Sequence, residues 1–196
     1  MKIIGITGGV GSGKSVVLSI LKDEFSASVY EADKLVHVLM KKGEPLYYEY
    51  VDLFGKEILD KDEEIDHKKV ATAVFNDHSL LIKLNKIVHP AVKVKILDLI
   101  EEERKNGTEL FVIEAALLIQ DGYKDICDEI WFIHVPHEIR IERLMSSRGY
   151  SYEKCKSILE NQPASDFYYK GSDRVIENDG KCEDLVNKIG NILHKY

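Results

Sequence analysis

The sequence predicts an α/β fold in which helices flank a parallel β-sheet, and three observations lead to this prediction. Short apolar runs alternate along the chain with segments whose apolar residues recur at helical spacing, as in a parallel α/β protein. The first run, KIIGITG at 2–8, ends in glycines and is followed at once by a helical pattern. The long stretch 34–105 is helical in pattern almost throughout, which indicates a helical insertion into the core.

The expected strands are short apolar runs bounded by turn residues or carboxylates. They lie at 2–8, 26–33, 109–118, 128–136 and 172–180. Helices of the core are expected at 14–25 and, as an amphipathic last segment, at 181–196.

Successive helices are expected within the insertion, at 34–43, 44–55, 67–76, 78–88 and 90–107. Pro45 and Pro90 suit the first turn of a helix, where a missing N–H costs nothing. Gly43, Gly55 and Gly107 suit helix ends.

The composition limits the classes of function. The net charge is −7, whereas broad binding to nucleic acid needs a basic face, so no nucleic-acid partner is expected. No apolar run approaches the roughly 18 residues that span a bilayer, and the N-terminus MKIIGITGG lacks the features of a signal peptide. We expect a cytoplasmic protein with no membrane partner, either a monomer or a weak homo-oligomer.

Three cysteines, Cys127, Cys155 and Cys182, lie far apart and form no C-x-x-C pair. This odd count and spacing argue against a disulfide framework or a zinc site. We expect buried or half-buried thiols.

Residues 8–15, Gly-Gly-Val-Gly-Ser-Gly-Lys-Ser, fit the P-loop pattern G-x-x-x-x-G-K-S/T between an expected strand and an expected helix. Glycines let the backbone wrap a phosphate with its N–H groups pointing inward, and the start of the helix adds partial positive charge. Lys14 is expected to reach the outer phosphates and the Ser15 hydroxyl to bind Mg²⁺. The expected nucleotide contacts are Gly8, Gly9, Gly11, Ser12, Gly13, Lys14, Ser15 and Val16.

Motifs elsewhere favour a kinase over a GTPase switch or an ATP-driven machine. NKIV at 85–88 and NKIG at 187–190 begin like the guanine-reading N-K-x-D motif but lack its Asp. ATP-driven machines usually need a longer chain than this one. A small-molecule kinase needs a carboxylate to orient the acceptor hydroxyl and cations around the phosphoryl group.

Each candidate for these groups has two interpretations, one as a catalytic or binding residue and one as a residue with only a structural role. Asp33 is the expected base, with Glu31 on the same side of an extended chain; Asp33 could equally be the N-cap of the next helix. Glu114, at the end of an apolar strand, could hold Mg²⁺ through water or merely end the strand. Arg140 and Arg143 share a helix face, with Arg148 close behind, so these residues form either an arginine-bearing lid or a solvated helix.

Several segments, taken in order, resemble the dephospho-CoA kinase family nearly from end to end. GITGGVGSGKS matches the opening of the family, LNKIVHPAV its H-P motif, and SSRGYS and VIENDG its lid and closing turn. YEADKLVHVLMKKGEP resembles its D-A-D segment, and LFGKEIL and KKVATAVFND its F-G and V-F signatures. The ordered set is more specific than the P-loop alone: Asp33, Phe54-Gly55, Val74-Phe75, His89-Pro90 and Asn178.

The resemblance implies transfer of the ATP γ-phosphate to the ribose 3′-hydroxyl of dephospho-coenzyme A, the last step of coenzyme A biosynthesis. ATP and dephospho-CoA would be the partners and Mg²⁺ the cofactor. A single P-loop kinase domain at 1–196 would have a core at 1–33, 106–136 and 166–196, a helical acceptor lobe at 34–105 and a lid at 137–165. Another P-loop nucleoside or nucleotide kinase is the alternative, and a nucleotide-binding protein without transferase activity is a third class.

Carried over residue by residue, the resemblance implies three catalytic residues, Asp33, Lys14 and Arg143. Arg140, Arg148 and Asn178 would join the loop in binding ATP. Asp33, Glu31 and His89 would bind the acceptor, although a structural role for His89 is equally open.

The chain departs from the family pattern at several positions. Glu31 stands where the family usually has Asp, His67 where an L-D-R segment has Arg, and Arg140 where a lid Gln is common. AALLIQ at 115–120 replaces a P-L-L-F-E motif. These departures leave the P-loop and Asp33 untouched, and they indicate a divergent branch or a relative with a shifted acceptor.

Overall fold

The computed structural model describes residues 1–193, which divide into two compact units. One unit is formed by residues 1–30 together with the chain from 106 onward, and the other by residues 31–105. The segment 34–105, expected to be a helical insertion, falls entirely within the second unit.

The first unit is built on a five-stranded sheet with the strand order β2-β3-β1-β4-β5. The strands are β1 (Lys2–Thr7), β2 (Ser28–Glu31), β3 (Leu110–Glu114), β4 (Glu129–His134) and β5 (Arg174–Glu177). Strand β1 pairs in parallel with both β3 and β4, and β4 pairs in parallel with β5. The expected parallel sheet is confirmed, with strands shorter than the apolar runs that predicted them.

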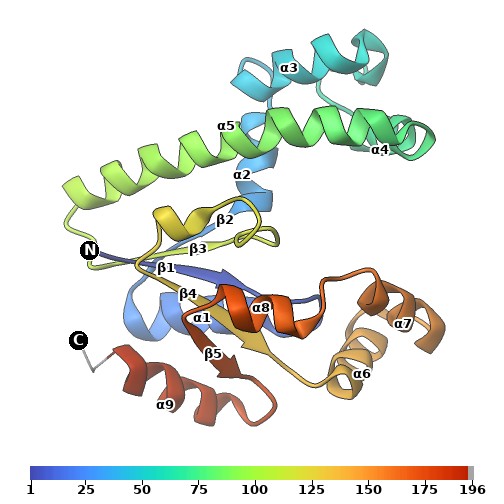
Figure 1. Cartoon of the computed structure of the whole chain (residues 1–196). Helices are drawn as coiled ribbons and strands as arrows, with labels where there is room; N and C mark the ends of the chain where they lie inside the picture. The colour runs from blue at the N-terminus through green and yellow to red at the C-terminus, as the bar shows by residue number, and fades with distance from the viewer. Residues whose placement is uncertain (194–196) are drawn as a thin grey trace. The chain divides into compact units, whose positions relative to one another are not determined.

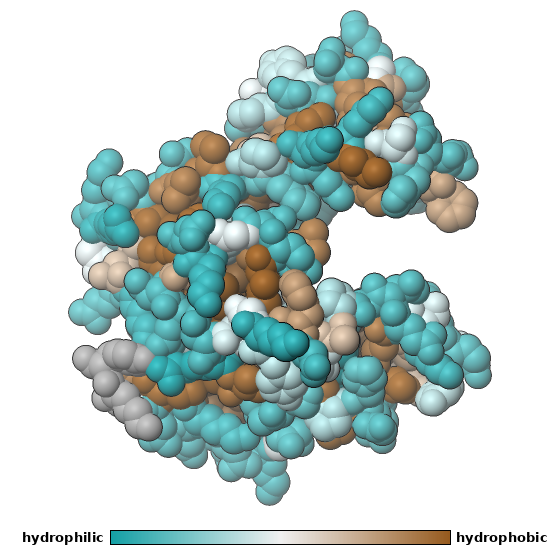
Figure 2. All heavy atoms as spheres, viewed as in Figure 1, coloured by the Kyte–Doolittle hydropathy of each residue, from teal (hydrophilic) through white to brown (hydrophobic). Residues whose placement is uncertain are grey.

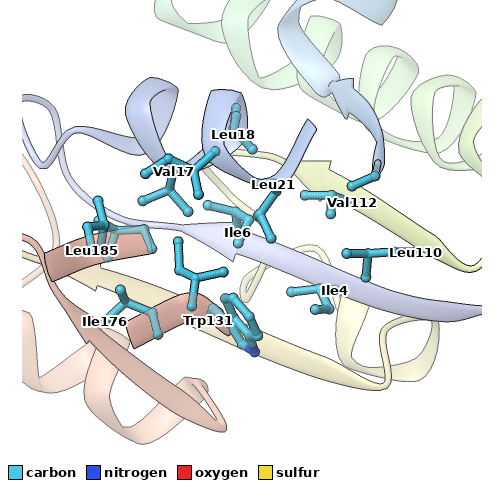
Figure 3. Packing of buried hydrophobic residues seen from close by; sticks show 14 residues of the cluster. Ile4, Ile6, Val17, Leu18, Leu21, Leu110, Val112, Trp131, Ile176 and Leu185 are labelled. Atoms are coloured by element: carbon cyan, nitrogen blue, oxygen red, sulfur yellow. The ribbon is translucent and has the colours of Figure 1, made fainter. Parts of the chain in front are cut away.

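Two helices supply the hydrophobic core on one face of this sheet, α1 (Lys14–Phe25) and α9 (Cys182–Leu193). Alternate residues of β1 and β4 point into this core, because successive side chains of a strand face opposite ways. Figure 3 shows Ile4, Ile6 and Trp131 packing with Val17 of α1 and Leu185 of α9. The helix expected at 14–25 has these bounds, while the part of the expected last helix at 194–196 lies outside the described residues.

Aromatic side chains occupy the strand positions between those that face this core, and so they point to the opposite face of the sheet. The rings of Tyr30 and Phe111 stack with their centroids 5.0 Å apart, and those of Phe132 and Tyr168 with centroids 4.9 Å apart. Tyr168 belongs to α8 (Ser165–Gly171), which contacts β4. Two further helices, α6 (His137–Arg148) and α7 (Tyr152–Glu160), pack against each other (Figure 1). A 3₁₀ turn, η2, spans Tyr123–Asp125.

The second unit is helical, as expected, but its helix count differs from the prediction. It contains α2 (Ala32–Leu39), α3 (Pro45–Phe54), α4 (His67–Asn76), α5 (His78–Lys105) and the 3₁₀ turn η1 (Lys56–Ile58). Pro45 begins α3 and Gly55 ends it, as expected. Gly43 does not end a helix, because α2 stops at Leu39.

The two helices expected at 78–88 and 90–107 are one continuous helix, α5, with Pro90 inside it. Proline inside a helix removes one backbone hydrogen bond and usually kinks or ends the helix. Here α5 contacts α2, α3 and α4 (Figure 1), and we attribute the continuous helical backbone through Pro90 to that packing. The prediction failed because tertiary contacts outweighed a local preference.

Within residues 1–193, no helix is long and apolar enough to cross a membrane, and the face seen in Figure 2 is mainly hydrophilic.

Cys127 and Cys155 are buried thiols, as expected. Cys182 is exposed, contrary to the expectation, because it opens α9 rather than facing the sheet.

Candidate active site

The glycine-rich loop runs from the end of β1 to the start of α1. Ser12 N–H donates to Gly9 C=O at 3.2 Å, which closes a turn at the top of the loop. Gly13 is the N-cap of α1 and has left-handed backbone (φ 83°), a conformation that glycine adopts without steric cost. The first N–H groups of a helix have no partner within it, so this loop can offer backbone donors to an anion.

Asn178, just beyond β5, braces the loop at its helical end. Its Nδ2 donates to Ser12 C=O at 2.9 Å, and its side chain is buried. A Cβ at Gly13 would lie 2.3 Å from this Nδ2, so a side chain there would displace Asn178. Arg143 of α6 in turn donates from Nη2 to the backbone carbonyl of Asn178 at 2.8 Å.

Arg140 braces the other end of the loop. Its Nε donates to Val10 C=O at 2.9 Å, and its Nη2 donates to Oε1 of Gln162. The guanidinium is buried, which lowers the pKa of Arg140. Gln162 was not among the residues predicted from the sequence, because nothing in the turn NQPA after α7 signals a contact with residues 152 positions earlier.

Lys14 and Glu114 form the charged centre of the site. Lys14 Nζ lies 3.5 Å from Glu114 Oε1 and donates to Gly8 C=O at 2.9 Å. Both side chains are mostly buried, at 19% and 13% exposure. Glu114 ends β3 and pairs in register with Ile6 of β1, so the parallel sheet brings it to the edge where the loop begins. The pairing of the P-loop lysine with a strand-end carboxylate was not predicted.

Two hydroxyl groups at this edge are buried without a hydrogen-bond partner among the described residues, Thr7 Oγ1 and Ser12 Oγ. An unpaired buried polar atom is costly in a folded protein. Both side chains belong to the loop or to the strand that leads into it. Such atoms are suited to a polar ligand that occupies the loop.

The oxygen donors at the loop fit a magnesium ion held mainly by a bound nucleotide. Ser15 is exposed in the first turn of α1, and the Glu114 carboxylate lies beside Lys14. Among the described residues no group of three or more His, Cys, Asp or Glu could hold a metal ion. Mg²⁺ needs few protein ligands when substrate phosphates and water complete its shell. Binding of Mg²⁺ by Ser15 and Glu114 stays a prediction.

The remaining arginine of the predicted lid, Arg148, is the last residue of α6 and is exposed. Gly149 ends the helix in left-handed conformation (φ 64°). Arg140 and Arg143 lie on one helix as expected, but their observed hydrogen bonds go to the backbone of the loop and its brace. Contact of these arginines, of Val16 or of Asn178 with ATP stays a prediction.

In the helical unit, Asp33 lies in the first turn of α2, and the N-cap of that helix is Glu31. The alternative interpretation of Asp33 as an N-cap is therefore wrong. The shared orientation predicted for Glu31 and Asp33 is also wrong, because Glu31 ends β2 whereas Asp33 is helical. Glu31 forms an ion pair with Lys34 at 2.6 Å.

Two histidines that the sequence singled out also lie in this unit. His89 is half-buried in the middle of α5 instead of opening a helix, because α5 continues through Pro90. His67 begins α4, and its ring meets the ring of His37 edge to face, with centroids 4.8 Å apart.

A parallel sheet of this strand order, with a braced glycine-rich loop between β1 and α1, defines a P-loop kinase fold. The sequence model of one family, dephospho-CoA kinase, matches residues 2–184. The chain therefore belongs to the dephospho-CoA kinase family.

Known relatives match this chain over nearly their full length. A dephospho-CoA kinase of Carboxydothermus hydrogenoformans is 35% identical and covers all of this chain and 95% of its own. One from Aquifex aeolicus is 38% identical, covering all of this chain and 97% of its own. The solved structure of dephospho-CoA kinase from Campylobacter jejuni superposes with a TM-score of 0.73 at 25% identity, over all of this chain and 97% of that one.

Proposed function

We propose that this chain transfers the γ-phosphate of ATP to the ribose 3′-hydroxyl of dephospho-coenzyme A, which gives coenzyme A. The observation that carries the proposal is the family match over residues 2–184, with a structurally complete phosphate loop at its start. Two relatives that match the whole chain are named dephospho-CoA kinase.

The loop is proposed to bind the phosphates of ATP through its backbone and through Lys14. Phosphoryl transfer requires positioning and charge stabilisation more than covalent chemistry from the protein. The loop carbonyls of Val10 and Ser12 accept bonds from Arg140 and Asn178. Carbonyl oxygens occupied in this way do not face a bound phosphate, which they would repel.

Mg²⁺ would be held by Ser15 and, through water, by Glu114. The chemistry that the bound ion supplies is neutralisation of negative charge on the transferred phosphoryl group. Glu114 also provides a counter-charge for Lys14 at 3.5 Å, which orients the ammonium group before ATP binds. Arg143 and Arg148 are proposed to add positive charge from α6.

Asp33 is proposed as the base that orients the acceptor hydroxyl and takes its proton. Its carboxylate is exposed, and it does not cap α2, so it is not required to complete that helix. Glu31 and His89 are proposed to contact dephospho-CoA.

The experiment measures ADP release from ATP and Mg²⁺ with dephospho-CoA, beside a panel of nucleosides and nucleoside monophosphates. We expect turnover with dephospho-CoA alone, and phosphorus NMR of the product should show a new 3′-phosphomonoester. Lys14→Ala is the inactive control. Turnover with another acceptor, but none with dephospho-CoA, would overturn the proposed acceptor and leave the kinase assignment in place.

A further inference from the structure

Arg140 is a buried charge on α6, with an exposed fraction of only 8%. Arginine is almost never buried to this extent without partners, because an isolated buried charge is costly. The other buried residue of the helix, Leu144, lies one turn further along on the same face. The partners of the Arg140 guanidinium therefore explain why the charge is placed there.

Both backbone groups of Val10 are held by Arg140 and Gln162. Arg140 Nε donates to Val10 C=O at 2.9 Å, and Val10 N–H donates to Gln162 Oε1 at 3.2 Å. The same Oε1 accepts a bond from Arg140 Nη2, so the three residues form a closed network. Because both its C=O and its N–H are bonded, the backbone of Val10 is held in orientation as well as in position.

Gly9 provides the space for this network. A Cβ at Gly9 would lie 2.3 Å from Arg140 Nη2 and 2.7 Å from Gln162 Oε1. The guanidinium and the amide therefore pack directly on the main chain of the loop, where no side chain could be accommodated. Gly9, the second glycine of the motif, therefore leaves the space that this hydrogen-bond network needs, in addition to any role in phosphate binding.

The side chain of Val10 extends the connection into the helices α6 and α7. It packs against a small hydrophobic cluster of Leu144, Cys155 and Leu159, which joins the two helices. Gln162 lies two residues after the end of α7, and its N–H donates to Leu159 C=O. Backbone and side chain of one loop residue are therefore both held by the same pair of helices.

We propose that Arg140 and Gln162 are positioning residues that shape the phosphate loop for ATP, through their shared contacts with Val10. Arg140 acts on ATP through the loop and not by touching the nucleotide. Removing either side chain releases a backbone group of Val10, which allows the loop to sample conformations with a carbonyl turned inward. The effect falls on ATP affinity, and the acceptor site in the other unit is not involved.

The test compares Arg140→Ala, Gln162→Ala and the double variant, and it rests on the proposed function only in taking ATP as the ligand. ATP affinity is measured by calorimetry without any acceptor, so a failure of the acceptor assignment does not affect it. We expect each single variant to weaken ATP binding by roughly tenfold, and the double variant to be no more than about twofold weaker than Arg140→Ala. Glu142→Ala, an exposed change on the same helix, is the control and should bind ATP normally.

Steady-state kinetics separate positioning from general instability. The KM for ATP should rise while kcat and the KM for dephospho-CoA stay within about twofold. Arg140→Lys keeps the charge but loses the forked geometry, and it should restore affinity only in part. Normal affinity in Gln162→Ala with weak binding in Arg140→Ala would indicate direct contact with ATP and overturn the proposal, as would additive losses in the double variant. If Arg140→Ala does not fold, Gln162→Ala decides by itself: ATP binding weakened roughly tenfold supports the proposal, and normal ATP affinity overturns it.

Discussion

Asn178 Nδ2 donates a hydrogen bond of 2.9 Å to the carbonyl oxygen of Ser12, which lies 166 positions earlier in the chain. Asn178 reaches this point because β5 pairs beside β4 and ends at the same edge of the sheet as β1. Its own backbone carbonyl accepts a bond from Arg143, so a helix, a strand end and the phosphate loop meet in one chain of hydrogen bonds.

Asn178→Ala should destabilise the fold and weaken ATP binding together. The change leaves the buried carbonyl of Ser12 without its donor, which costs about 1–3 kcal/mol. Urea unfolding measures the first effect and calorimetry the second. Asp179→Ala, an exposed change next to it, is the control; equal stability of the two variants would contradict the bracing role of Asn178.

Glu114→Gln tests the carboxylate beside Lys14. Because a neutral amide holds water on Mg²⁺ less strongly, we expect the Mg²⁺ concentration for half-maximal activity to rise roughly tenfold, with a lower kcat. Glu109→Gln, an exposed change just before the same strand, should leave the magnesium titration unaltered. A magnesium titration of Glu114→Gln that overlays the wild type would remove Glu114 from the metal shell.

Asp33→Asn tests the proposed base. The amide cannot accept the proton of the acceptor hydroxyl, so turnover should fall by roughly 10²-fold or more while ATP affinity stays near normal. Asp98→Asn, on an exposed face of α5, is the matched control within the same unit. Full turnover in Asp33→Asn would exclude Asp33 as the base.

The three cysteines should differ sharply in reactivity. Cys182 is exposed, whereas Cys127 and Cys155 are buried. Burial raises the pKa of the Cys127 thiol to about 12, so almost no thiolate forms there near neutral pH. Alkylation of the native protein at pH 8, followed by peptide mass spectrometry, should label Cys182 first and the other two only after unfolding. Rapid labelling of Cys127 in the native state would contradict its burial.

The same shift predicts a loss of stability in alkali. The pKa of Cys127 rises from 9.0 in the unfolded chain to about 12 in the fold, so its contribution is fully present below pH 9. Above pH 9 the unfolded state ionises first, and the contribution falls progressively toward pH 12. Cys127→Ala should show a shallower decrease in unfolding free energy between pH 9 and 11 than the wild type. Parallel curves for the two proteins would show that ionisation of Cys127 does not contribute to the loss of stability in alkali.

The sequence could predict what is encoded locally. The motif at 8–15 specifies a phosphate loop because its glycines, Lys14 and Ser15 are consecutive and lie between a strand and a helix. The parallel sheet and the place of Glu114 at a strand end were also predicted from local patterns, whereas the strand order was not. Asp33 was selected as the last residue of the expected second strand, which would place it in extended chain, but it lies in a helix.

Tertiary structure alone decided which distant groups meet the loop. Pro90 predicted a helix boundary, yet packing against three neighbouring helices carries α5 through it. Arg140 and Gln162 are 22 positions apart, and neither carries a local signal for a contact with Val10. Such contacts depend on where whole helices and strands pack. That packing is set by the burial of many apolar side chains at once, which no short stretch of sequence contains.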